Sequence, residues 1–464
     1  MNGMKLGNFD IVSSVEEITI RFGFSGGFMS VAKNRARSLI LGAAVLLSAF
    51  FSPPVSALTI EQAVDLALAQ NERPKAADEE AFAAEARVGR ARSFFLPDLT
   101  LTGDYTRRSH ETQRTVDGET STLQSRDALE ARALFSQTIF DAQGFPLLSQ
   151  AKRERDAVRY DALDAKRRLA YETAQAFLSV LADDQFARAA ARRVDFAQQS
   201  LEEIRARFEA QLVGSNDVTR AELEAATSQR ELLRLEGAAR TSRLHLEFLL
   251  GQSIPDSLVV PRDLLDRAIQ PVTPSGNAAQ QRLDLLAQQE RTEAARASAK
   301  EPLMRYFPDL DFNGEAWTTN ESGFSARSED WFLAMGLSWD LFDGGERESD
   351  HSERKALARR AEWDLANAER SVDIDVETAR VSLESEQTSL VRAEEAVDAA
   401  ERNAREVTEL YRQGLVRALE IVDANFQLFS TQVERTNAQY SLAVAYLGFR
   451  AAEGLEPFET EAAP

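Results

Sequence analysis

Residues Phe95–Leu99 read FLPDL, and residues Tyr306–Leu310 read YFPDL. The dipeptide Phe-Asp at 140–141 likewise returns at 342–343. The interval is about two hundred residues, which is far longer than the repeats of roughly 20–50 residues that build solenoids. The chain therefore contains two copies of one large unit.

Each Phe-Asp pair is followed by a long segment with a helical pattern. The segment runs from Phe140 to Leu212 in the first copy and from Phe342 to Gly414 in the second, with Pro146 as its only proline. Each spans 72 positions, since 212 − 140 equals 414 − 342, and this corresponds to roughly 105 Å of α-helix.

Apolar residues in these segments recur every seven positions. The second copy carries this spacing at Val376, Leu383, Leu390, Val397, Ala404 and Tyr411. The first copy carries it at Val180, Ala187, Val194, Leu201 and Phe208. Such heptads predict coiled-coil packing, and the many alanines allow close helix approach. Each long helix ends in a related motif, FEAQLV at 208–213 and YRQGLV at 411–416, so we expect helical hairpins with tips at about 212–217 and 414–423.

Each proline motif is followed by two segments that alternate with period two. We expect strands at about 98–106, 128–140, 309–317 and 331–342, joined in pairs by polar loops. The last of these places tryptophan near both ends and large apolar residues on one face, as in a transmembrane β-barrel strand of about ten residues. A soluble two-sheet sandwich is the alternative. Four strands cannot close a barrel and lipid tolerates no open edge, so three copies would supply twelve strands.

The N-terminal region has the pattern of a secretory signal peptide at 29–57. Basic residues precede an apolar run at 39–51, and Val55-Ser56-Ala57 supplies small residues at the cleavage position. We interpret residues 1–28 as an upstream extension and place the true start at Met29. An uncleaved membrane anchor is the alternative.

These elements divide the chain into six segments. They are the extension 1–28, the signal peptide 29–57, repeat 1 at 58–250, a linker at 251–277, repeat 2 at 278–453 and a disordered tail at 454–464.

Composition excludes several functions. The formal net charge of −21 argues against a nucleic-acid partner, because phosphate binding needs a basic surface. Cysteine is absent, which excludes disulfides, a thiolate nucleophile and a lipid-modified cysteine. The three histidines are scattered, and no nucleotide loop or paired catalytic group is present. We expect neither an enzyme nor a metal or other cofactor.

The order of these motifs resembles the TolC family of outer-membrane efflux and secretion ducts over about 58–455. The resemblance implies a mainly α-helical fold with membrane β-structure, in which a trimeric 12-stranded β-barrel continues into a long periplasmic α-helical barrel. It also implies a homotrimer in the outer membrane of a Gram-negative bacterium, in contact with lipid. Its expected partners are a periplasmic adaptor and an inner-membrane RND, ABC or MFS pump. The cargo would be small toxic molecules or polypeptides, and the choice between efflux and type I secretion stays open.

The resemblance also suggests a gate at the hairpin tips. Glu420 and Asp423 match acidic ring positions that narrow the pore, and Asp217 matches an acidic position in the first tip. Tyr411 matches a closed-state tyrosine, whose partner arginine would fall beside Arg417. Asp217 could instead cap a helix, and Glu420 and Asp423 could be ordinary solvated residues.

Two other protein classes also have coiled-coil hairpins or stalks. A trimeric surface adhesin would place one set of strands at its C-terminus, in contrast to the two internal pairs found here. A periplasmic adaptor would lack the aromatic alternation at 331–341.

Overall fold

The computed structural model describes residues 57–116, 119–321 and 327–458. The expected extension 1–28 and signal peptide, except for Ala57, lie outside the described residues. Ala57–Pro464 form one compact unit, and the elements below belong to it.

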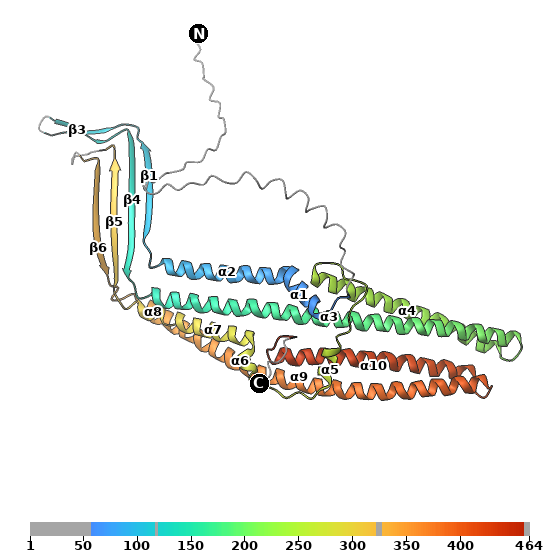
Figure 1. Cartoon of the computed structure of the whole chain (residues 1–464). Helices are drawn as coiled ribbons and strands as arrows, with labels where there is room; N and C mark the ends of the chain where they lie inside the picture. The colour runs from blue at the N-terminus through green and yellow to red at the C-terminus, as the bar shows by residue number, and fades with distance from the viewer. Residues whose placement is uncertain (1–56, 117–118, 322–326, 459–464) are drawn as a thin grey trace, which may run out of the picture. The chain divides into compact units, whose positions relative to one another are not determined.

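Four antiparallel strands form one sheet in the order β1-β4-β5-β6 (Figure 1). They are β1 (Asp98–Arg107), β4 (Asp127–Phe140), β5 (Asp309–Thr319) and β6 (Glu329–Ser338). The central pair β4–β5 joins the two sequence repeats, so neither repeat forms the sheet alone. The strands β1 and β6 are the edges.

The register places most large apolar side chains on one face of this sheet, while Leu134, Trp317 and Phe332 lie on the other. Leu101 lies opposite Ala133, Ala133 opposite Ala316, and Ala316 opposite Trp331. The same face carries Leu99, Tyr105, Leu129, Phe135, Phe312, Leu333, Met335 and Leu337. The opposite face carries Thr102, Asp104, Glu130, Arg132, Asn313, Glu315 and Ser338. One face therefore suits lipid and the other suits water.

The polar segment after β1 is more ordered than the sequence predicts. It contains a second antiparallel pair, β2 (Thr112–Val116) with β3 (Glu119–Gln124), where we expected a loop. These strands are rich in threonine and other polar residues, with Val116 and Leu123 as their apolar residues, so they give little periodic signal and were predicted as a loop.

Repeat 1 contributes four helices. They are α1 (Ile60–Gln70), α2 (Glu72–Ser93), α3 (Gly144–Glu209) and α4 (Ser215–Leu250). The Thr59 side chain and Gln62 form a capping box at the start of α1. Asn71 ends α1 in an extended conformation and caps α2, which separates the two helices.

The linker and repeat 2 contribute six helices to the described part of the chain. They are α5 (Arg262–Ile269), α6 (Ala278–Gln281), α7 (Leu283–Ser298), α8 (Glu301–Met304), α9 (Glu346–Arg412) and α10 (Ala418–Ala452). An isolated parallel β-bridge between Leu58 and Leu258 joins the linker to the segment before α1. None of the helices in the described ranges combines the length and apolar character needed to cross a membrane.

The Phe-Asp motifs begin the long helices. Asp141 accepts a hydrogen bond from the backbone N–H of Gln143 at 2.8 Å. Asp343 accepts two, from Gly345 and Arg347, each at 3.1 Å. Desolvation opposes ionisation of Asp343, but these donors outweigh it and lower its pKa. The repeated aspartate therefore accepts hydrogen bonds from backbone N–H groups where each long helix begins.

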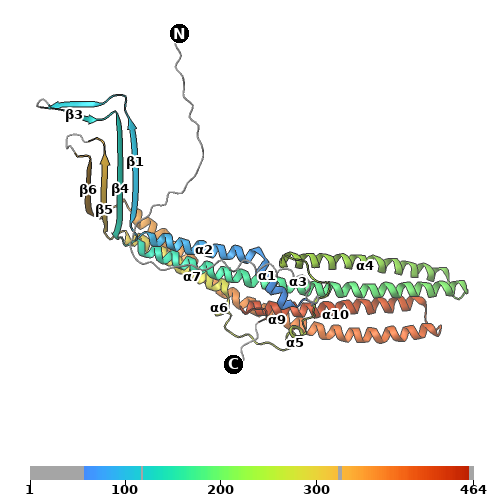
Figure 2. The same ribbon diagram turned by 45° about the horizontal axis from the view of Figure 1, so that its top comes forward.

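The long helices lie in two hairpins, α3 with α4 and α9 with α10, which extend in the same direction (Figures 1 and 2). Contacts between α3 and α10 join the hairpins, while α7 lies between α3 and α9 nearer the strands. The main core lies where these helices meet and includes Phe177, Leu246, Leu383 and Leu447.

The tail is shorter than expected, because its first residues are packed. Arg167 donates a hydrogen bond to the carbonyl oxygen of Gly454 at 2.6 Å, and the Tyr171 hydroxyl donates to that of Leu455 at 2.9 Å. Disorder from 454 onward is therefore wrong for 454–458, and 459–464 lie outside the described residues. The turns at the hairpin tips are also shorter than expected, because α4 already begins at Ser215 and α10 at Ala418.

Candidate functional site

The tips of the two helical hairpins pack against each other. Ile204 and Ala221 of the first hairpin form a buried cluster with Tyr411 and Ile421 of the second. The cluster is separate from the main core and has fewer buried residues. Partly buried apolar residues of both hairpins pack around it, among them Leu201, Val218 and Val407.

Tyr411 is the main aromatic residue of this cluster and is only 5% exposed. The Arg207 guanidinium lies 4.3 Å from the centroid of its ring, within the range of a cation–π contact. Arg207 also pairs with Glu203 on its own helix at 2.7 Å. The Tyr411 hydroxyl has no hydrogen-bond partner within the described chain. Burial raises its pKa, and the charge of Arg207 opposes the rise.

A second arginine joins the hairpins further from the tip. Arg193 of α3 pairs with Glu224 of α4 at 2.7 Å, and both side chains are largely buried. The same guanidinium lies 4.9 Å and 5.0 Å from the ring centroids of Phe426 and Phe429 of α10. Neither arginine is among the residues predicted from the sequence. One sequence feature could have identified them. Each arginine directly precedes a heptad residue, Val194 or Phe208, and this position places its charge beside the packed seam.

Arg417 does not have the contact that we expected. It is the exposed N-cap residue of α10, and its side chain makes no hydrogen bond or ion pair within the described ranges. Arg207 takes the place beside Tyr411. The tyrosine therefore contacts the other hairpin through Arg207, and it shares a buried cluster with Ile421 of its own hairpin.

Glu420 and Asp423 are exposed and lie three residues apart in the first turns of α10. This spacing puts both carboxylates on one side of the helix, while Ile421 and Ala424 are buried. Neither carboxylate forms an ion pair with the described residues. Two free negative charges are thus presented to solvent at the tip.

Asp217 has a different environment. It accepts a hydrogen bond from the backbone N–H of Gly214 at 3.4 Å, in the first turn of α4, which is a capping contact. It also lines a groove of about 190 Å³ with Leu419 and Val422, which Glu420 and Asp423 do not line. Within one copy the structure does not bring the three acids together.

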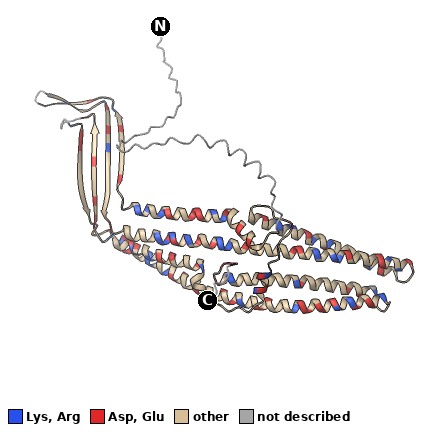
Figure 3. Ribbon diagram, in the orientation of Figure 1, with Lys and Arg blue, Asp and Glu red and all other residues tan. Residues whose placement is uncertain are grey.

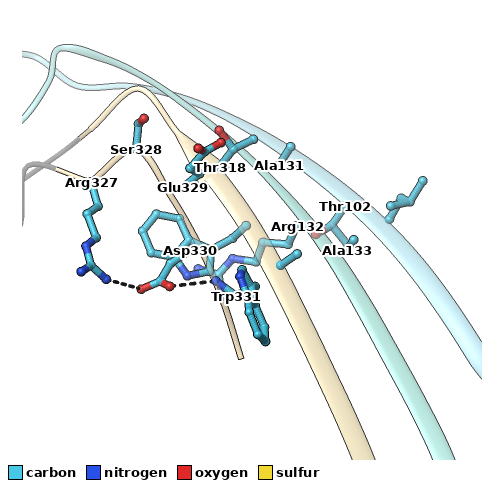
Figure 4. Close-up of a pocket in the computed structure, with 13 residues that line it drawn as sticks. Thr102, Ala131, Arg132, Ala133, Thr318, Arg327, Ser328, Glu329, Asp330 and Trp331 are labelled. Carbon is cyan, nitrogen blue, oxygen red and sulfur yellow. Dashed lines mark hydrogen bonds and ion pairs between the residues drawn. The ribbon is translucent and has the colours of Figure 1, made fainter. Parts of the chain in front are cut away.

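A groove of about 950 Å³ lies on the sheet (Figure 4). Arg327 and Asp330 face each other there at 3.9 Å, and Arg132 in the same groove pairs with Glu315 at 3.4 Å. The groove follows the curved strands and offers no convergent set of polar groups. Across the described ranges, no group of three His, Cys, Asp or Glu side chains is arranged to hold a metal ion.

Charged residues occur both on the helices and on the four main strands (Figure 3). In the middle of the sheet, Asp104, Glu130, Arg132 and Glu315 all lie on its polar face, which agrees with an opposite face that meets lipid.

Residues 63–252 and 275–455 match the family model for outer membrane efflux proteins. The chain belongs to this family. The two matched blocks correspond to the two sequence repeats, so the family resemblance is confirmed. An efflux protein of this family is an outer-membrane channel that extends into the periplasm and is not an enzyme. The adhesin, adaptor and sandwich alternatives are therefore wrong.

Solved structures share the fold of this efflux protein. VceC of Vibrio cholerae is 17% identical with a TM-score of 0.73, covering 85% of this chain and 96% of its own. The CmeC outer membrane channel of Campylobacter jejuni is 17% identical with a TM-score of 0.72, covering 86% and 87%. The MtrE channel of Neisseria gonorrhoeae, in its open state, is 17% identical with a TM-score of 0.71, covering 86% and 89%. None of the curated protein sequences compared with this chain matches it.

Proposed function

We propose that three copies of this efflux protein assemble into a passive exit duct, with a shared twelve-stranded barrel in the outer membrane. The main support for this proposal is the four-stranded sheet, which has an apolar face and two unpaired edge strands, β1 and β6. Unpaired backbone groups at such edges are not tolerated in lipid. Pairing β6 of one copy with β1 of the next satisfies both edges, and three copies give an even strand number suited to an outer-membrane barrel.

The hairpin tips form the gate of this duct in our proposal. The small cluster around Tyr411 and the contact with Arg207 support a closed arrangement that can separate. Glu420 and Asp423 support a selective ring, because three copies bring six free carboxylates around one axis. Rings of acidic side chains favour cations. Asp217 caps α4 and supports the ring only indirectly, and Arg417 is an exposed neighbour of the ring.

An inner-membrane pump of the RND, ABC or MFS class and a periplasmic adaptor would deliver the cargo. Family membership favours efflux of small toxic molecules over secretion of polypeptides. Deleting the gene and measuring both drug sensitivity and the secreted proteins decides between them. Increased sensitivity supports efflux, whereas loss of one secreted polypeptide with unchanged sensitivity supports secretion.

Planar-bilayer recordings of the purified protein test the gate. Replacing Glu420 and Asp423 together by Ala should weaken cation preference and block by polyvalent cations, because fewer fixed charges attract counter-ions. The double variant Glu369→Ala and Asp373→Ala removes two exposed charges of α9, about forty positions before the end of that helix, and is the control. Unchanged selectivity in the first double variant would contradict the gate assignment.

A further inference from the structure

The helices of one copy form rows with two open ends. Nearer the strands, α2 contacts α3, α3 contacts α7 and α7 contacts α9. Nearer the tips, α4 contacts α3, α3 contacts α10 and α10 contacts α9. In both rows α9 is one outer helix, and α2 or α4 is the other.

The outer helices are direct continuations of the edge strands. The chain passes from α2 into β1 at 93–98, and from β6 into α9 at 338–346. A copy that pairs its β6 with the β1 of a neighbour therefore brings its own α9 beside the α2 of that neighbour. On each side of one copy, the unpaired edge strand and the outer helix that continues from it form one continuous flank.

Each outer helix presents a large exposed aromatic side chain to this flank. Phe82 of α2 is 72% exposed and Trp363 of α9 is 74% exposed. Phe82 lies two positions from the buried Ala84, and Trp363 lies nine positions from the buried Val372. At about 100° per residue, both aromatics point away from the packed side of their helix.

Ion pairs fix the level of Phe82 along α3. Lys166 pairs with Asp78 at 2.7 Å, and Arg159 pairs with Glu85 at 2.9 Å. Because α2 and α3 are antiparallel in this pairing, Phe82 lies level with about residue 162 of α3.

The contacts of α7 fix the level of Trp363 in the same way. Arg291 pairs with Asp161 of α3, and the next residue, Thr292, donates a hydrogen bond to the carbonyl oxygen of Ala361 of α9 at 3.3 Å. Residue 361 of α9 is thus level with about residue 161 of α3. Phe82 and Trp363 therefore lie at the same height on opposite flanks of one copy.

We propose that Phe82 of one copy packs against Trp363 of the next, as an aromatic contact that closes the helical ring below the barrel. The occupant of each flank is a second copy of this chain. Other exposed apolar residues extend both flanks toward the tips, at Leu223, Leu233, Leu244 and Phe248 on α4 and at Ile374, Val381 and Val391 on α9. The inference rests on the proposed trimer and specifies which surfaces meet in it.

Site-directed crosslinking tests this contact, because the chain contains no cysteine. The double variant Phe82→Cys with Trp363→Cys, treated in isolated outer membranes with a short bismaleimide, should give covalently linked chains up to a trimer. The control pairs Phe82→Cys with Ile374→Cys. Ile374 is exposed and lies eleven positions beyond Trp363, on the same side of α9 but about 16 Å further along it. The control should remain mostly uncrosslinked.

Native mass spectrometry of the same variants distinguishes a failure of the aromatic contact from a failure of the proposed trimer. A trimer that does not crosslink at 82 and 363, or that crosslinks equally in the control, overturns the aromatic contact and leaves the proposed function intact. Absence of any trimer overturns both.

As a second measurement, Phe82→Ala and Trp363→Ala should lower the dissociation temperature of the trimer non-additively, because residues in contact couple. Additive losses would contradict the contact.

Discussion

Gly144 shows how one residue constrains the passage from strand to helix. A Cβ atom placed there would lie 2.5 Å from Cζ of Phe95 and 2.6 Å from Cδ1 of Phe94. Phe95 also contacts Phe145, with ring centroids 5.4 Å apart. Phe95 of the FLPDL motif and the preceding Phe94 therefore pack on the first turn of α3.

Gly144→Ala should destabilise the protein by about 1–3 kcal/mol, because the added methyl overpacks these rings. Thermal denaturation in detergent measures the change. Gly89→Ala is the matched control, since nothing lies within 4 Å of a Cβ there and Ala is the better helix former. Equal effects in the two variants would contradict the packing argument.

At the tip, the ring of Tyr411 makes the contact and its hydroxyl does not. Tyr411→Phe should therefore leave the gate closed, whereas Arg207→Ala should loosen it. A cation–π contact of about 0.5–1 kcal/mol corresponds to about a two- to fivefold rise in open probability in bilayer recordings.

Arg205→Ala is the control for the Arg207 variant. Arg205 pairs with Glu222 of its own hairpin at 2.7 Å, so its loss should not change the contact between hairpins. A larger effect of Tyr411→Phe than of Arg207→Ala would show that the hydroxyl matters after all.

At the scale of elements, period-two alternation and strand register together make the sheet amphipathic. Leu333 lies opposite Gly314 on the apolar face, and its neighbour Ala334 lies opposite Asn313 on the polar face. A register shift of one residue would exchange these faces, so the apolar environment specifies the register.

Leu333→Arg should destabilise the membrane-inserted protein by about 2–4 kcal/mol, the cost of a charge at the lipid-facing centre of a barrel strand. Ala334→Arg, one residue away, should be tolerated because it faces the polar side. The yield of folded protein in outer membranes and its resistance to heat in detergent measure both. Similar losses in the two variants would contradict the assignment of the faces.

Within the whole Ala57–Pro464 unit, ion pairs connect helices that are distant in sequence. Arg282, at the start of α7, bridges Asp284 at 2.6 Å and Asp375 of α9 at 2.7 Å. Desolvation of the Asp284 carboxyl favours a raised pKa, but Arg282 outweighs this and lowers it below the ordinary value.

A lowered pKa in the folded state gives a defined pH dependence. The stabilisation is present above the unfolded pKa of about 3.9 and is lost as pH falls through the lower folded pKa. The denaturation temperature of the protein should therefore fall in acid. The denaturation temperature of the Asp284→Asn variant should fall less steeply. Glu61→Gln, an exposed carboxyl in α1, is the control and should follow the unsubstituted protein. An unchanged slope for Asp284→Asn would exclude this carboxyl as the cause.

The sequence by itself determined the two repeats, the four main strands and the long heptad hairpins, because these depend on periodicity within short windows. A repeated motif also marked the hairpin tips, where Tyr411, Glu420 and Asp423 lie, and the gate role of these residues stays a prediction. Only the tertiary structure decided that Arg207 is the partner of Tyr411 and that 454–458 pack on α3. These contacts join residues about two hundred or more positions apart. Their geometry follows from how the hairpins pack together, which no local pattern encodes.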